Sequence, residues 1–163
     1  MQKITPFMWF NTQAEDAVKF YTSIFKNSKT LGVSCNYEEG SEIPGARQGT
    51  PMVIEFELEG QEFRAINGGP QFTFSPAISF TVNCDSQEEV DYYWEKLSEG
   101  GDESAQQCGW LKDKYGLSWQ IVPTVLGQLL SSRDRVQSGR VMQALLQMKK
   151  INITELQKAY DGV

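Results

Sequence analysis

The side chains that most often carry enzyme chemistry are unevenly represented in this chain, which has no histidine among its 163 residues. Without histidine there is no Ser-His-Asp triad, no Cys-His pair, no HExxH zinc helix and no two-His-one-carboxylate iron site. The three cysteines, Cys35, Cys84 and Cys108, are odd in number and widely separated, so they form neither a CxxC redox pair nor a zinc knuckle. The sequence therefore excludes a large part of hydrolase and metalloenzyme chemistry.

The overall charge and the N-terminal residues narrow the partners and the compartment. Fifteen Lys and Arg against 21 Asp and Glu give a net charge of −6, which favours neither nucleic acid nor an anionic membrane as a partner. The first ten residues, MQKITPFMWF, lack the apolar run of a signal peptide, and no window of roughly 18 apolar residues occurs. With its unpaired cysteines, the chain is expected to be cytoplasmic.

Two amphipathic helices are predicted, over residues 12–25 and 85–97. Each begins with a pair typical of a capping box and continues with apolar residues at i, i+3, i+4 and i+7. The capping pairs are Thr12 with Glu15 and Asp85 with Glu88. The apolar positions are Ala17, Phe20, Tyr21 and Ile24 in the first helix and Val90, Tyr93, Trp94 and Leu97 in the second. Because the two helices share one register, the sequence indicates an internal repeat.

The strand-like runs around these helices repeat as well. ITPFMWF precedes the first helix and PAISFTVN the second, and a turn glycine leads into each closing strand, Gly60 to Ile66 and Gly116 to Val122. Between helix and closing strand, further strands are expected at residues 29–37 and 52–58 in the first half, and near 103–107 and at 109–112 in the second. The predicted class is α+β, with one β-α-β-β-β module over residues 1–70 and another over 71–123.

Residues 124–163 form a tail with no counterpart in the first half. Three segments, TVLGQLL, RDRVQSGRVMQALLQMKKI and NITELQKAYDGV, are predicted to be helical from their apolar spacing. The apolar positions are Val141, Leu145 and Met148, followed by Ile153, Leu156 and Tyr160. This stripe must be buried either on the body of the protein or on a second subunit.

Three stretches of the repeat carry a family resemblance: ITPFMWFNTQAEDAVKFY, AINGGPQFTFSPAISFTVNC and, most specifically, CGWLKDKYGLSWQIVP at 108–123. The chain resembles the vicinal-oxygen-chelate superfamily of glyoxalases, bleomycin-resistance proteins and extradiol dioxygenases. It is most similar to the PhnB-like branch, often described as demethylubiquinone methyltransferase-type. The resemblance covers residues 3–123 and extends to the RVMQALLQMKKI segment. It implies two paired modules with curled mixed sheets around a cavity, usually completed in a dimer, so we expect a homodimer.

The resemblance also implies where metal ligands would lie, on the first and last strands of each module. Those positions fall near Thr5 or Pro6, at Arg64, near Pro76 or Ala77, and at Gln120. Pro and Ala have no side-chain donor atom, Arg is a permanent cation, and Gln is a weak neutral ligand. We therefore expect no bound metal and no other cofactor.

Strand alternation predicts which side chains line the implied cavity. If Phe63, Ala65, Trp119 and Ile121 face the helices, then Arg64, Ile66, Gln120 and Val122 face the opposite side. The candidate ligand-binding residues are Phe7, Trp9, Arg64, Ser79, Thr81, Trp110 and Gln120. Such a pocket suits a flat or apolar small molecule with an anionic group, held by Arg64.

Most of these residues have a purely structural alternative. Arg64 is equally suited to pair with Glu55 or Glu57 or to reach solvent, while Phe7 and Trp9 are the kind of aromatic residue that packs on a sheet. Cys108 reads first as a small packing residue rather than a reactive thiol.

Two loops also have alternative readings. The segment Asn67-Gly68-Gly69-Pro70 favours a turn over a backbone anion site. Residues 38–50, rich in Gly and acids, favour a surface loop over a flap that covers the cavity or reaches across a dimer.

Three function classes are compatible with the sequence. The first is a PhnB-like protein that binds a small anionic or aromatic molecule in a metal-free cavity. The second is a metal-independent enzyme of lyase or isomerase type that uses Arg64 electrostatically and Gln120 or a Glu for orientation. The third is an interaction module that uses the tail helices. A methyltransferase description fits poorly, because no strand leads into a GxGxxG-like loop.

Overall fold

The computed structural model describes residues 2–163, and the chain divides into two compact units, Met1–Phe74 and Ser75–Val163. Each unit contains one mixed sheet, with four strands in the first unit and three in the second. Neither sheet closes into a barrel within the described residues. The α+β class and the repeated arrangement of strand, helix and closing hairpin are confirmed.

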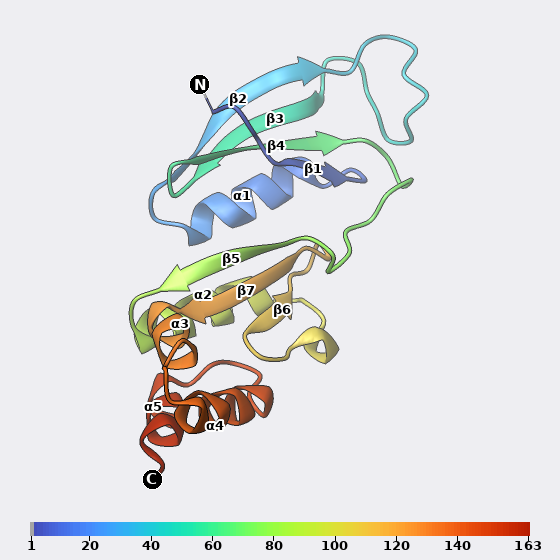
Figure 1. Ribbon diagram of the computed structural model, residues 1–163. Helices are drawn as coiled ribbons and strands as arrows, with labels where there is room; N and C mark the ends of the chain where they lie inside the picture. Colours follow the sequence, from blue (N-terminus) through green and yellow to red (C-terminus); the bar gives the residue numbers. More distant parts are fainter. Residues whose placement is uncertain (1) are drawn as a thin grey trace. The chain divides into compact units, whose positions relative to one another are not determined.

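The first unit consists of β1 (Phe7–Phe10), α1 (Ala14–Ile24), β2 (Ser28–Asn36), β3 (Pro51–Leu58) and β4 (Gln61–Asn67). The sheet order is β1-β4-β3-β2, in which β1 is parallel to β4 and the other pairs are antiparallel. Figure 1 shows α1 lying along one face of this sheet. A two-residue turn at Glu59 and Gly60, both with positive φ (48° and 80°), joins β3 to β4 as a tight hairpin.

The predicted helix α1 buries the expected side of its surface, but the expected capping box is wrong. Ala17, Tyr21 and Ile24 are buried, whereas the N-cap residue is Gln13, whose side chain makes no capping hydrogen bond. The Ala14 amide donates instead to Oδ1 of Asn67, 2.8 Å away. Asn67, at the end of β4, thus satisfies one of the free amides at the start of the helix.

The second unit begins with β5 (Ser79–Cys84), α2 (Gln87–Ser98), the short 3-10 helix η1 (Glu103–Ala105), β6 (Trp110–Lys112) and β7 (Ser118–Pro123). The sheet order is β5-β7-β6, with β5 parallel and β6 antiparallel to β7. In α2 the N-cap is Ser86, whose hydroxyl accepts from the Glu89 amide, so the predicted pair Asp85 and Glu88 is off by one residue.

The strand predicted near residues 103–107 is absent. The Asp102 carboxylate accepts hydrogen bonds from the amide and the hydroxyl of Ser104, at 2.9 and 2.6 Å, and this local turn starts η1. Only Gln107 makes an isolated antiparallel bridge, to Trp110. The second sheet therefore has one strand fewer than the first.

The tail forms α3 (Thr124–Leu130), α4 (Arg135–Leu146) and α5 (Ile153–Asp161), which confirms the three predicted helices. The apolar stripe is buried within the second unit, in a cluster of Leu126, Leu129, Val141, Leu145, Ile151 and Leu156. Cys108 and Val122 of the same unit pack against this cluster. The stripe thus lies on the body of the protein and needs no second subunit to cover it. No helix within residues 2–163 is long and apolar enough to cross a membrane.

Candidate functional site

The candidate residues of the first unit lie on the face of its sheet opposite α1, which we call the first open face. Met8, Phe10, Phe63 and Ala65 are buried on the helix side, as the alternation predicts. Phe7, Trp9 and Arg64 alternate with them, and Phe7 is 55% exposed. The predicted orientation of these three side chains is confirmed, whereas ligand contact stays a prediction.

Strand register arranges the first open face in rows that run across the sheet. Glu55 of β3 is paired with Arg64 of β4, which is paired in turn with Phe7 of β1. The next row toward the end of β4 consists of Val53, Ile66 and Trp9. The next row in the other direction, toward the hairpin, consists of Lys29, Glu57 and Glu62. The face therefore grades from charged at the hairpin to apolar at Trp9, with the Glu55 and Arg64 row at the boundary.

Arg64 is paired with an acid, in agreement with the structural alternative. Its Nε lies 3.0 Å from Oε1 of Glu55, directly across the β3–β4 ladder. The Arg64 side chain is 54% exposed and that of Glu55 32%, so solvent still reaches the pair. The guanidinium is thus accessible to a ligand, but a carboxylate already balances its charge.

Trp9 is held in one orientation by its surroundings. The indole Nε1 donates to the Gly69 carbonyl oxygen at 2.9 Å, and Phe72 packs edge-on against the indole with ring centroids 5.0 Å apart. A Cβ atom at Gly68 would lie 2.3 Å from the indole, so only glycine fits there without moving the ring. Trp9 is therefore a fixed aromatic surface at the apolar end of the first open face.

The Asn67-Gly68-Gly69-Pro70 segment leads from the end of β4 into a turn that begins at Pro70, and its two glycine amides are already used. The Gly68 amide donates to the Phe10 carbonyl oxygen at 2.9 Å, and the Gly69 amide donates to that of Asn11 at 3.1 Å. These bonds take up the donors that a backbone anion site would need. Gly68 and Gly69 instead hold the Trp9 side chain in place.

Sequence reasoning missed the importance of Asn67, which is buried. In addition to capping α1, its Nδ2 donates to the Pro51 carbonyl oxygen at 3.2 Å, and its own carbonyl oxygen accepts from the buried Tyr37 hydroxyl. Burial, followed by the nearby Glu15 charge, raises the pKa of Tyr37, so the phenol remains a donor. The only signal in the sequence was a polar residue at the end of a predicted strand.

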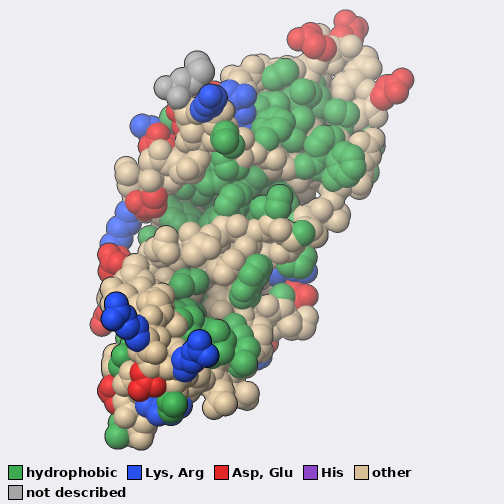
Figure 2. Space-filling view, viewed as in Figure 1, with side chains coloured by type: hydrophobic (Ala, Val, Ile, Leu, Met, Phe, Trp, Pro, Cys, Tyr) green, Lys and Arg blue, Asp and Glu red, His purple; other side chains and the backbone are tan. Residues whose placement is uncertain are grey.

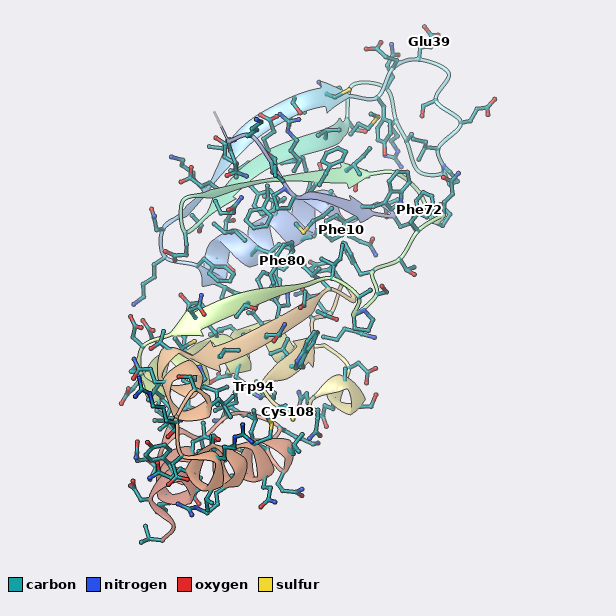
Figure 3. All side chains as sticks on the ribbon, in the orientation of Figure 1. Phe10, Glu39, Phe72, Phe80, Trp94 and Cys108 are labelled. Carbon is teal, nitrogen blue, oxygen red and sulfur yellow. The ribbon has the colours of Figure 1, made fainter. Side chains whose placement is uncertain are left out.

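The loop of residues 37–50 is closed by a hydrogen bond at its base, and Ile43 in its middle lies close to Gly69 of the first unit. The Tyr37 amide donates to the Thr50 carbonyl oxygen at 3.0 Å, and a Cβ atom at Gly69 would lie 3.4 Å from Ile43. Glu39 points away from the sheet (Figure 3), and acidic side chains mark this loop in Figure 2. The segment is a surface loop with an acidic exterior.

The candidate residues of the second unit share the face of its sheet opposite α2, which we call the second open face. Trp110, Gln120 and Thr81 form one row across β6, β7 and β5. Nε2 of Gln120 donates to the Ser79 hydroxyl oxygen at 2.9 Å. Trp119 and Ile121 are buried on the helix side, as predicted. This face presents hydroxyl and amide groups beside one indole.

Asp113 is a second residue that sequence reasoning missed, although it lies within the most specific motif. It is buried, and Oδ1 accepts from the amides of Tyr115 and Leu117 at 2.8 and 3.1 Å. Its Oδ2 accepts from the Trp119 indole at 2.9 Å. These bonds hold the β6–β7 hairpin, so the aspartate has a structural role.

Two of the three cysteines, Cys84 and Cys108, are buried or partly buried. Cys108 packs beside the tail helices, in agreement with the packing interpretation (Figure 3). Burial raises the pKa of Cys84 to about 12, so this thiol stays protonated. Within residues 2–163, no group of three Cys, Asp or Glu side chains has the geometry of a metal site.

Comparisons with known proteins identify the family. A family described as 3-demethylubiquinone-9 3-methyltransferase matches residues 2–122. A Bacillus cereus structure described as a putative 3-demethylubiquinone-9 3-methyltransferase, PhnB protein, is 39% identical, with a TM-score of 0.63, and the match covers 76% of this chain and 100% of that one.

Two more distant structures support the fold alone. Protein PA1353 from Pseudomonas aeruginosa is 17% identical with a TM-score of 0.57, over 76% of this chain and 98% of its own. The fosfomycin resistance protein FosX from Listeria monocytogenes is 16% identical with a TM-score of 0.51, over 80% and 98%. No curated protein matches the chain.

Proposed function

The chain belongs to the PhnB-like branch of the vicinal-oxygen-chelate superfamily, in the family described as 3-demethylubiquinone-9 3-methyltransferase, and from this premise we propose that it binds a flat aromatic small molecule. The observation that carries the proposal is the arrangement of Phe7, Trp9 and Phe72 beside the half-exposed Arg64. Aromatic surfaces with a few convergent polar groups are typical of small-molecule sites.

The first open face supports a planar ligand in particular. Trp9 cannot swing freely, since Gly68 packs against its ring and Gly69 accepts its indole hydrogen. A pre-organised ring loses little entropy when a second ring stacks on it, so it favours a flat partner. The family description names a quinone, which is a flat ring of this kind.

The second open face, taken by itself, carries polar groups that suit a small molecule. Gln120, Ser79 and Thr81 provide neutral donors and acceptors, and Trp110 provides a ring in the same row. We propose that these residues form neutral hydrogen bonds to a small molecule on the second open face itself.

We do not propose methyl transfer, in spite of the family description. No strand leads into a glycine-rich loop for an adenosyl cofactor, and the amides of Gly68 and Gly69 are already bonded. We propose binding without a metal, because Pro, Ala, Arg and Gln at the inferred ligand positions are poor metal ligands. A homodimer is part of the proposal on the family resemblance alone, since the tail stripe is covered within its own unit. A cytoplasmic location is proposed from the unpaired cysteines.

Saturation-transfer NMR with 2-naphthamide as the probe tests the proposal. We expect transfer to the naphthalene protons with the unmodified protein and at least a fivefold weaker effect with Trp9→Leu, because the stacking surface is lost. Trp94→Leu, on α2, is the matched control and should bind the probe normally. Absence of transfer, or equal transfer to both variants, would overturn the proposal.

A further inference from the structure

The two cations on the first open face are each paired with a carboxylate of the same sheet. By register, the side chains on β2, β3 and β4 that carry charge there are Lys29, Glu55, Glu57, Glu62 and Arg64. Arg64 lies 3.0 Å from Glu55, and Lys29 lies 3.7 Å from Glu57. Two cations therefore stand against three carboxylates, and each of the two cations has an acidic partner.

We propose that Glu55 is a specificity-determining residue, which makes the first open face select a neutral aromatic ring over the same ring bearing a carboxylate. The inference rests on the proposed function and assigns the charge of its ligand. It reverses the sequence-based expectation that Arg64 holds an anion.

A guanidinium that is already paired with a carboxylate can still donate hydrogen bonds to a ligand. Arg64 has five N–H donors, and the bond to Glu55 uses the one on Nε, which leaves donors for a ligand. A neutral carbonyl or amide oxygen accepts such a donor and leaves the Arg64–Glu55 pair intact.

A carboxylate ligand is attracted by Arg64 but repelled by Glu55. To reach Arg64 it must come close to the Glu55 carboxylate, and like charges at such a distance repel each other. Displacing Glu55 instead would leave that acid without its partner. Either way, Glu55 cancels most of the attraction that an unpaired arginine would exert on an anion.

The position of the Glu55–Arg64 pair beside the aromatic residues allows it to select among bound rings by their charge. We call this selection the filter. Glu55 and Arg64 share a row with Phe7, next to the row that contains Trp9. A ring stacked on these aromatic residues brings its substituents toward the pair, because the strands of a sheet lie roughly 5 Å apart. The charge of the substituent then interacts with Glu55 and Arg64 at the edge of the aromatic surface.

Glu55→Gln tests the filter, with 2-naphthamide and 2-naphthoate as matched neutral and anionic probes. In the unmodified protein we expect the amide to bind at least fivefold more tightly than the carboxylate. In Glu55→Gln the carboxylate should gain about fivefold or more, since Arg64 is freed, while the amide changes by less than about twofold.

Glu57→Gln is the matched control, because Glu57 lies on the same strand and face and is paired with Lys29 instead. It should leave the ratio of the two affinities within about twofold. Circular dichroism of each variant confirms folding, which a change at a half-exposed pair should leave intact.

The outcomes separate this inference from the proposed function. Equal binding of both probes to the unmodified protein, or a ratio unaltered by Glu55→Gln, overturns the filter while aromatic binding stands. An equal gain in Glu57→Gln also overturns it, because the effect would then come from net charge alone. Failure of both probes to bind any variant overturns the proposed function and the filter with it.

Discussion

The two sequence modules begin alike and are completed differently. Each has an opening strand, a helix packed on the sheet, and a closing hairpin whose last strand lies parallel to the first. The first module adds β2 along β3, whereas the second has only the short η1 at the corresponding place in its sequence. The same strand-helix-hairpin frame therefore tolerates the loss of a strand.

In the second module, the segment before β6 is bonded to the tail. The amides of Cys108 and Gly109 donate to the carbonyl oxygens of Met148 and Lys149, both at 2.8 Å, and Nε2 of Gln107 donates to that of Leu146 at 2.7 Å. These residues directly precede β6, so the tail satisfies donors of the segment that leads into this strand. Backbone hydrogen bonds can thus be satisfied by either kind of neighbour.

The two modules also stabilise their hairpins in different ways. The β3–β4 hairpin closes with a two-residue turn, and Asn67 at its far end ties together β3, α1 and Tyr37. The β6–β7 hairpin closes with a longer turn wrapped around the Asp113 carboxylate. Four predictions follow from this contrast, ordered by the size of the expected effect.

Ending the chain after Pro123 should have the largest effect. It removes the buried cluster around Val141 and Leu156 and leaves the amides of Cys108 and Gly109 without acceptors. We expect the second unit to lose about 4 kcal/mol or more of stability, and the first to keep its own. Hydrogen exchange with mass spectrometry measures the two units separately. Deleting Val163 alone is the control. A second unit that stays fully protected without the tail would contradict the conclusion that the tail stabilises this unit.

Asp113→Ala should destabilise the second unit by about 3 kcal/mol, because the amides of Tyr115 and Leu117 and the Trp119 indole lose their acceptor. Denaturant unfolding followed by Trp fluorescence gives the change. Asp161→Ala, at an exposed position on α5, is the control and should be nearly neutral. Equal losses in the two variants would show that Asp113 does not hold the hairpin.

Asn67→Ala should lower the free energy of unfolding of the first unit by about 2 kcal/mol, because the α1 cap and the bond to Pro51 are lost. Amide exchange in the first turn of α1 should rise most. Asn36→Ala, at the exposed end of β2, serves as the control. Protection of α1 that is no lower in Asn67→Ala than in Asn36→Ala would argue against a cap supplied by β4.

The smallest effect concerns Asp91, whose carboxylate lies 2.6 Å from Nζ of Lys150 and accepts from Gln87 at 3.0 Å. The bond to Lys150, followed by that to Gln87, lowers the pKa of Asp91 below its ordinary value of 3.8. The contribution to stability is therefore complete above that value and is lost as the pH falls through the lowered pKa. Solvent screens the pair, because the Lys150 side chain is 42% exposed and that of Asp91 49%. The pair therefore contributes less than about 1 kcal/mol to the free energy of unfolding.

Asp91→Asn should remove this part of the acid destabilisation of the second unit. Unfolding measured between about pH 5 and pH 2 should then show a shallower decline than in the unmodified protein. Glu95→Gln, on the exposed side of the same helix, should retain the original slope. Identical slopes for Asp91→Asn and the unmodified protein would show that the ion pair does not help to hold the tail to α2.

Local periodicity predicted most of the fold. The spacing of Ala17, Tyr21 and Ile24 indicated the buried side of α1, and alternation placed Arg64 and Gln120 on the faces opposite the helices. These predictions succeeded because the 3.6-residue and two-residue periods are properties of the backbone, which neighbours in the sequence reveal. The strand expected near residues 103–107 failed because the Asp102 side chain competes for the backbone there.

The partners of polar side chains were beyond the reach of such patterns. Either Glu55 or Glu57 suited Arg64, and the two-residue turn at Glu59 and Gly60 set the register that brings Glu55 opposite it. The cap of α1 comes from Asn67, 53 residues away in the chain. The sequence by itself determined helices, strands and the faces they bury, since these depend on local spacing. Only the tertiary structure decided which polar groups meet, because a hydrogen bond depends on the distance between atoms and not on their separation along the chain.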